Sequence, residues 1–206
     1  LFSNTTGSNN TAVGEKSLYS NTSGYHNTAI GVSSLYFNIS GINNTAFGSN
    51  SLFGNNGDYN TALGSGSLAF NSTGFRNTAV GMGSLNSNLT AGENTAVGCT
   101  SLFTNTTGFS NTALGYSSLY FNLTGSHNTA LGYQSLLFNT TGAENTALGY
   151  NSLFSNTINS GNTAVGWNSL YSSTGWQNTA VGHHSLNLNT SGNYNTAIGY
   201  NAGSLV

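Results

Sequence analysis

Asparagine is the residue type whose spacing in this chain most clearly points to chemistry. The triplet Asn-x-[Ser/Thr], the acceptor motif for N-linked glycans, recurs at a nearly fixed interval. The acceptors at the common phase are Asn4, Asn21, Asn38, Asn71, Asn88, Asn105, Asn122, Asn139 and Asn189, and Asn9 and Asn43 begin two further Asn-Asn-Thr triplets. Because such acceptors belong on exposed turns of secreted proteins, we expect glycosylation at these asparagines. The alternative is that Asn, Thr and Gly simply form turns here, and that the motif is a by-product of turn chemistry.

Groups that could bind a metal ion or catalyse a reaction are sparse. His26 and His127 lie six repeats apart, and His183 and His184 are adjacent, so they would point to opposite sides of a strand or sit on a corner. Calcium binding would need carboxylates on every turn, whereas the chain has four acidic residues in all. No carboxylate pair or Ser-His-carboxylate set is expected to converge. The sequence therefore predicts no metal site, no cofactor and no enzymatic activity.

The candidate acceptors belong to a tandem repeat. The phrase Asn-Thr-Ala-[Val/Ile/Leu/Phe]-Gly occurs twelve times, with a spacing of 17 residues nine times and 16 residues twice. The copies start at Asn10, Asn27, Asn44, Asn60, Asn77, Asn94, Asn111, Asn128, Asn145, Asn162, Asn178 and Asn195. Such a pattern is typical of one structural unit copied along an axis, so residues 1–206 are predicted to be a single array.

Each repeat, numbered from its first Asn, is too short for a helical hairpin and is rich in β-branched and aromatic residues. We predict an all-β fold, a parallel β-solenoid of about twelve coils with two short strands per coil, at positions 1–4 and 8–11. Glycine at positions 5 and 15 would form the corners. Coils stacked about 4.8 Å apart would make a rod about 58 Å long. The two shorter repeats lose their residue in the polar turn, around 54–57 and 172–175.

The side-chain pattern predicts which columns lie inside this rod. Leucine at position 9 should face inward together with one of the two neighbouring columns at positions 3 and 4, and the other should face outward as an interaction surface. We expect the inward column to be Ala at position 3, from Ala12 to Ala197. Asparagine at position 1 should form a hydrogen-bonded column along the axis. An aromatic strip at position 6, from Tyr116 to Tyr200, would stabilise the rod by stacking or bind sugars or a partner strand.

Composition narrows the function classes. Only 3% of residues are charged and two are basic, which excludes a nucleic-acid interface. No apolar run approaches the roughly 20 residues of a transmembrane helix, and the single Cys99 cannot form an internal disulfide. Leu1 begins inside a repeat without Met, which we interpret as a segment of a longer protein or filament. The uncharged residues at both ends, Leu1–Ser3 and Tyr200–Val206, predict that the stack continues.

The run Asn-Thr-Ala-[Val/Ile/Leu]-Gly-x-x-Ser-Leu resembles the head repeats of trimeric autotransporter adhesins, whose related Ala-[Ile/Val]-Gly-x-x-[Ser/Ala] rhythm builds left-handed parallel β-rolls. It also resembles repeats of tail-fibre-like surface proteins. The period of 17 and the bulky residues at positions 10 and 11 depart from the adhesin pattern.

These observations favour a structural extracellular filament or fibre-shaft protein, N-glycosylated and self-associating, head to tail or as a homo-oligomer, outside the cell or at its surface. The alternative is an adhesin or tail-fibre module that contacts a host surface. A third class, an ice-binding solenoid, is suggested by the threonine column at position 2, but the bulky residue at position 4 argues against it.

Overall fold

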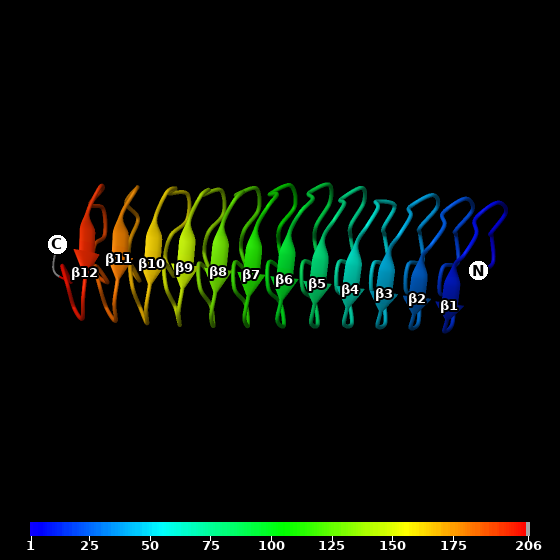
Figure 1. Cartoon of the computed structure of the whole chain (residues 1–206), viewed down its shortest axis with the longest axis horizontal. Helices are drawn as coiled ribbons and strands as arrows, with labels where there is room; N and C mark the ends of the chain where they lie inside the picture. The colour runs from blue at the N-terminus through cyan, green and yellow to red at the C-terminus, as the bar shows by residue number, and fades with distance from the viewer. Residues whose placement is uncertain (205–206) are drawn as a thin grey trace.

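The computed structural model describes residues 1–204, which form a rod of stacked coils (Figure 1). Each coil from β1 onward contributes one three-residue strand, and the strands pair in parallel in chain order. The strands are β1 (Thr11–Val13), β2 (Thr28–Ile30), β3 (Thr45–Phe47), β4 (Thr61–Leu63), β5 (Thr78–Val80), β6 (Thr95–Val97), β7 (Thr112–Leu114), β8 (Thr129–Leu131), β9 (Thr146–Leu148), β10 (Thr163–Val165), β11 (Thr179–Val181) and β12 (Thr196–Ile198). The predicted parallel β-solenoid with one repeat per coil is confirmed.

The interior is built from two facing columns, Ala at position 3 and Leu at position 9. Every alanine from Ala29 to Ala180 and every leucine from Leu18 to Leu170 in these columns is fully buried. The two columns form one continuous core along the rod. Because successive strand residues point to opposite sides, burying Ala turns the neighbouring Thr and aliphatic side chains outward. The predicted inward alanine column is therefore confirmed, and the aliphatic residue at position 4 forms the outward column.

Positions 8–11 form turns, so the predicted second strand is wrong. The cause is the backbone at positions 7 and 9, where φ is positive, for example 55° at Ser33 and 49° at Leu35. Parallel strands need φ near −120°, so the alternation of left-handed residues keeps the chain from extending. Hydrogen bonds between coils persist nevertheless, as between the Leu35 N–H and the Ser51 carbonyl at 3.0 Å.

A leucine in the left-handed region costs roughly 1–2 kcal/mol relative to ordinary backbone. Burial of its side chain contributes about 1.5–3 kcal/mol in the opposite direction. The serine at position 8 closes the same turn, since Ser34 Oγ donates to the Gly31 carbonyl at 3.0 Å. The serine hydroxyl and the burial of leucine together thus stabilise a bend whose positive φ leucine disfavours.

Glycine at position 5 is required where the chain leaves each strand. At Gly115 φ is 132°, and a Cβ atom there would lie 2.5 Å from the carbonyl oxygen of Gly132 in the next coil. Any side chain would both strain the backbone and separate the two coils. The predicted corner at this position is confirmed.

The two 16-residue coils keep the strands in register. Thr45 pairs with Thr61 and Thr163 with Thr179, as in the longer coils. The missing residue is absorbed in the polar turn, as predicted. Across residues 1–204 there is no helix with the length and apolar character needed to cross a membrane. Leu205 and Val206, part of the predicted uncharged end, lie outside the described residues.

Candidate functional surfaces

The asparagines at position 1 form a hydrogen-bonded column inside the rod. Asn128 donates its backbone N–H to Asn111 Oδ1 at 2.9 Å and its side-chain amide to the Gly142 carbonyl at 2.8 Å. Most of the column is fully buried. The same bonds recur from coil to coil, which confirms the column predicted from the sequence.

The asparagines at position 12 form a second buried column. Asn38 Nδ2 donates to Asn21 Oδ1 at 2.9 Å and to the Gly41 carbonyl at 3.0 Å, so both of its amide hydrogens are used. The equivalent buried acceptor-motif asparagines, each at most 1% exposed, are Asn21, Asn38, Asn71, Asn88, Asn105, Asn122, Asn139 and Asn189. The expectation that these side chains are exposed is therefore wrong. A glycan on Nδ2 would replace a hydrogen bond of the column and would have to occupy space already filled by the adjoining coil.

The repeat itself explains why the position-12 asparagines are buried, although their triplet has the form of an exposed glycan acceptor. The glycine at position 15 brings its carbonyl oxygen close to the asparagine three residues earlier, as in Asn122 Nδ2 to Gly125 at 2.9 Å. An asparagine repeated at one phase can satisfy its amide along the axis, as at position 1. The recurrence of asparagine at position 12 was therefore the signal for an interior column, as it was at position 1.

Two predicted acceptors, Asn9 and Asn43, lie outside these columns, and Asn4 is the end member of the position-12 column, where its Oδ1 accepts from Asn21 Nδ2 at 2.9 Å. Asn4 and Asn9 are exposed and Asn43 is half-buried. The amide of Asn4 donates to the Gly7 carbonyl at 2.9 Å. Asn9 and Asn43 occupy position 17, where φ is 55° at both, and neither side chain makes a hydrogen bond within residues 1–204. Asn9 and Asn43 are the candidate acceptors whose amide nitrogen is free in the folded rod.

The histidines lie apart from one another except at one corner. His26 packs edge-on to Tyr25, and His127 edge-on to Phe109. His183 and His184 follow β11 at a corner, and their ring centroids are 4.4 Å apart. Of the two predicted arrangements, the structure therefore shows the corner and not opposite sides of a strand. Within residues 1–204 no three His, Cys, Asp or Glu side chains gather as a metal site would require.

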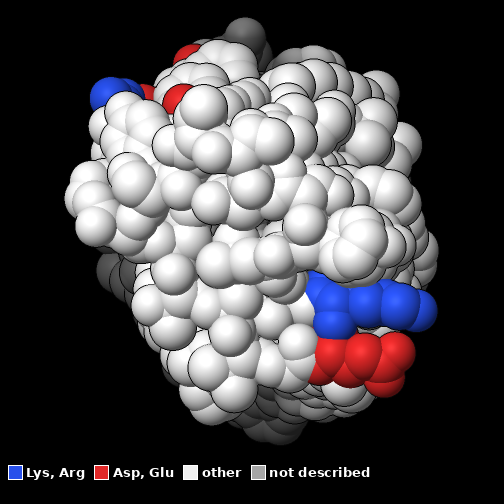
Figure 2. All heavy atoms as spheres, turned by 90° about the vertical axis from the view of Figure 1, so that its right-hand side faces the viewer, with Lys and Arg blue, Asp and Glu red and all other residues white. Residues whose placement is uncertain are grey.

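Four of the six charged side chains form two close pairs at the surface. Arg76 lies 3.3 Å from Glu93 one coil away, and Lys16 lies 3.7 Å from Glu15, with all four side chains at least half exposed. Exposed pairs of this kind contribute little to stability. Figure 2 looks along the rod at one end and shows a surface on which charged atoms are few.

The aromatic strip at position 6 stacks from Tyr116 to Tyr150, whereas Trp167, next along the rod, stands edge-on with its plane 74° from that of Tyr150. Tyr133 lies between Tyr116 and Tyr150, with ring centroids 5.3 and 5.1 Å apart and planes within 13° of parallel. Their rings therefore cover one another and turn their edges outward. The structure shows the predicted stacking among these tyrosines, and binding of a sugar or a partner strand by the strip stays a prediction.

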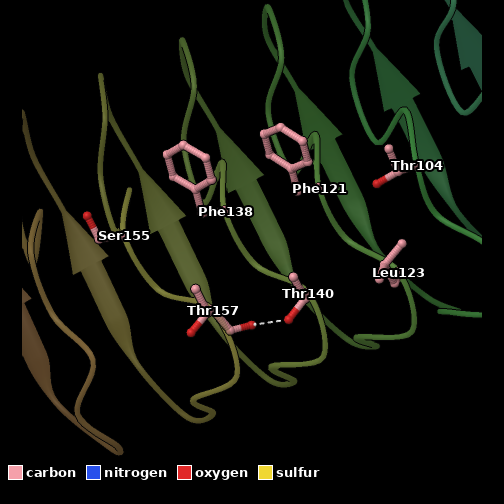
Figure 3. Close-up of a pocket in the computed structure, with 7 residues that line it drawn as sticks. All are labelled: Thr104, Phe121, Leu123, Phe138, Thr140, Ser155 and Thr157. Carbon is pink, nitrogen blue, oxygen red and sulfur yellow. Dashed lines mark hydrogen bonds between the residues drawn. The ribbon is translucent and has the colours of Figure 1, made fainter.

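A hollow interrupts the surface on another side of the rod. Phe121 and Phe138 stack 5.3 Å apart at position 11, while the small residues Thr104 and Ser155 occupy this position in the coils on either side. The space between these rings and the threonines of the polar turn, Thr140 and Thr157, measures about 500 Å³ (Figure 3). This volume is within the range of small-molecule sites, although the hollow is open to solvent.

The outward side of the strands forms the largest regular surface. We define the sheet face as the side chains at positions 2 and 4 of β1–β12, which are Thr and an aliphatic residue or Phe. All of them are exposed or half-buried; Val13 is 55% and Phe47 54% exposed. No threonine hydroxyl of the sheet face makes a hydrogen bond within residues 1–204. The face is thus a regular array of methyl groups and free hydroxyls without a charge.

Comparisons with known proteins give no relative: no protein-family model, no curated protein and no solved structure matches this chain.

Proposed function

We propose that this chain is a rigid structural shaft, part of an extracellular filament or fibre. The observation that carries the proposal is the continuity of the position-1 asparagine column and of the Leu-Ala core from coil to coil. The position-12 column adds to them from Asn4 to Asn156 and is interrupted at Ser173. The strands pair in one register throughout, so the array offers no hinge between β1 and β12.

The surface supports a structural role rather than a catalytic one. The same side-chain types recur in nearly every coil. Because the net charge is only −2, it is the exposed hydroxyls and amides of Thr, Ser and Asn that bind water at the surface. The chemistry of the surface therefore differs little from one end of the rod to the other. Such a surface suits a spacer that holds other parts of a protein at a fixed distance.

Axial assembly follows from the same regularity. Every coil presents a ladder of backbone groups to the coil on each side, so a coil of one copy can stack on a coil of another at the spacing of about 4.8 Å that it uses internally. We propose that the shaft extends in this way, through further coils of the same protein or through other copies. Asn9 and Asn43 remain the acceptors proposed for glycans.

Small-angle scattering and electron microscopy of the purified chain test the shaft. The expected result is a stiff rod with a length of about 58 Å, or a multiple of it, and axial diffraction near 4.8 Å. A flexible chain or a compact globule would contradict the proposal. Gly115→Ala, which introduces a Cβ 2.5 Å from the next coil at a positive φ, should break the rod. Gly54→Ala is the comparison variant with the smaller expected effect, because its φ is ordinary and its Cβ would lie 3.3 Å from the Ala69 carbonyl oxygen, which a shift of a few tenths of an ångström relieves.

The hollow beside Phe121 and Phe138 favours a second candidate, an adhesin-like module that binds a glycan of a host surface. An aromatic face next to hydroxyl groups suits the apolar face and hydroxyls of a sugar. Glycan-array binding by the native rod, lost in Phe121→Ser/Phe138→Ser but kept in Phe37→Ser, would support it. Phe37 is the matched control, since it occupies the same repeat position and is 50% exposed. No binding to any glycan would remove this candidate.

A further inference from the structure

We propose that the sheet face is an interface between two copies of this chain, which pair side by side with their rods aligned. The starting observation is the exposure of an apolar column along the whole rod. Six residues at position 4 are at least 40% exposed: Val13, Phe47, Leu63, Leu114, Leu131 and Ile198. A contiguous apolar surface of this kind on a soluble protein marks an interaction site.

The shape of the face suits another sheet. The strand arrows keep nearly the same direction from β1 to β12 (Figure 1). Sheets of many strands that stay flat are unusual and are typically stabilised by stacking against another layer. In stacked sheets the facing side chains interdigitate about 10 Å apart, and identical columns form dry interfaces.

A second copy is the partner that this face fits. None of the side chains of the sheet face, from β1 to β12, is ionisable. The face therefore lacks the charges that a different protein of opposite charge would recognise. Its columns repeat at the coil spacing, and a second copy has the same spacing. Thr and aliphatic side chains of one copy can therefore lie between those of the other in every coil, and the threonine hydroxyls gain partners.

The area is sufficient for a specific dimer. Twelve coils at about 4.8 Å and three strand residues at about 3.3 Å give a footprint of about 570 Å² per copy. The total for two copies, roughly 1,140 Å², clears the area of about 1,000 Å² that a biological interface needs and lies just below the standard size. It lies well above most crystal-packing contacts, which bury less than about 800 Å² in total.

The first test is the mass of the native chain by sedimentation equilibrium, with matched lysine variants. The wild type is expected at twice the chain mass of 21.2 kDa. Leu114→Lys/Leu131→Lys places two unpaired charges in the centre of the face and should raise the dissociation constant by about 100-fold or more. Leu89→Lys/Leu188→Lys is the control, because these leucines lie outside the strands and are equally exposed, at 44% and 50% against 40% and 43%.

The second test needs no substitution and decides between side-by-side and end-to-end association. Cys99 follows β6 near the middle of the rod, so a spin label there reports the offset between two copies. Pairing through the sheet face predicts a distance between labels well below half the rod length. End-to-end stacking predicts about 58 Å.

A monomeric wild type, a dimer that survives Leu114→Lys/Leu131→Lys, equal loss in both lysine variants, or a label distance of about 58 Å would each overturn the pairing. The shaft proposal would survive all of these results, because it is tested on the shape and stiffness of the rod itself.

Discussion

Asn128 and Asn139 donate to the same carbonyl oxygen, that of Gly142, at 2.8 and 2.9 Å. Asn128 is position 1 of its coil and Asn139 is position 12 of that coil, so this carbonyl joins the two buried columns. The Asn-x-x-Gly turn, which looks like an exposed glycan acceptor, is therefore part of what holds successive coils together.

Removing one amide from the second column should destabilise the rod strongly. Asn139→Ala leaves the buried Asn122 Oδ1 without its donor at 2.7 Å and removes the acceptor of Asn156 Nδ2. We expect the free energy of unfolding to fall by about 2–4 kcal/mol. Urea denaturation followed by circular dichroism measures it. Thr141→Ala, two residues away and exposed, is the control, and equal midpoints for the two variants would show that the column contributes nothing.

The leucine column should behave as a tightly packed core. Leu102→Ala removes a fully buried side chain between the coils on either side, and we expect a loss of about 2–5 kcal/mol. Leu89→Ala, at a site 44% exposed, should change stability by less than about 0.5 kcal/mol. A melting curve of Leu102→Ala that coincides with the wild type would rule out this interior.

At position 7 a glycine variant should be more stable than an alanine variant, the reverse of what is usual. Gln134 has a φ of 51°, and the same position holds Gly66 and Gly83 in other coils. Because Cβ is strained by roughly 1–2 kcal/mol in the left-handed region, Gln134→Gly should be more stable than Gln134→Ala by about 1 kcal/mol. Comparison of the two denaturation midpoints checks this. A more stable alanine variant would mean that φ at position 7 is not positive in solution.

The buried and free acceptor asparagines should differ in their modification. In native material from a glycosylating host, peptides containing Asn71, Asn105 and Asn139 are expected to be bare, while Asn9 and Asn43 are available. Site-resolved mass spectrometry measures the occupancy. A glycan on Asn105 in folded rods would contradict the hydrogen bond that its Nδ2 makes with Asn88 Oδ1 at 3.1 Å.

Much of this architecture could be predicted from the repeat. From the phrase that recurs every 17 or 16 residues one could predict one unit per coil and parallel strands paired in register. One could also predict that the two short coils lose a residue in the polar turn without a shift of the strands. The repeat also determined the Leu column and the Asn column at position 1, because identical residues at one phase must lie above one another in a stacked array.

Two features depended on how each coil closes in three dimensions. Apolar spacing does not reveal the sign of φ, so Leu35 and its equivalents looked like strand residues although they occupy left-handed turns. The motif at Asn38 describes only three neighbouring residues, whereas its burial depends on the Gly41 carbonyl and on Asn21 one coil away. The sequence determined which side chains repeat along the axis. The tertiary structure decided which of them face inward, because the direction of a side chain is set by the path of the whole coil around its core.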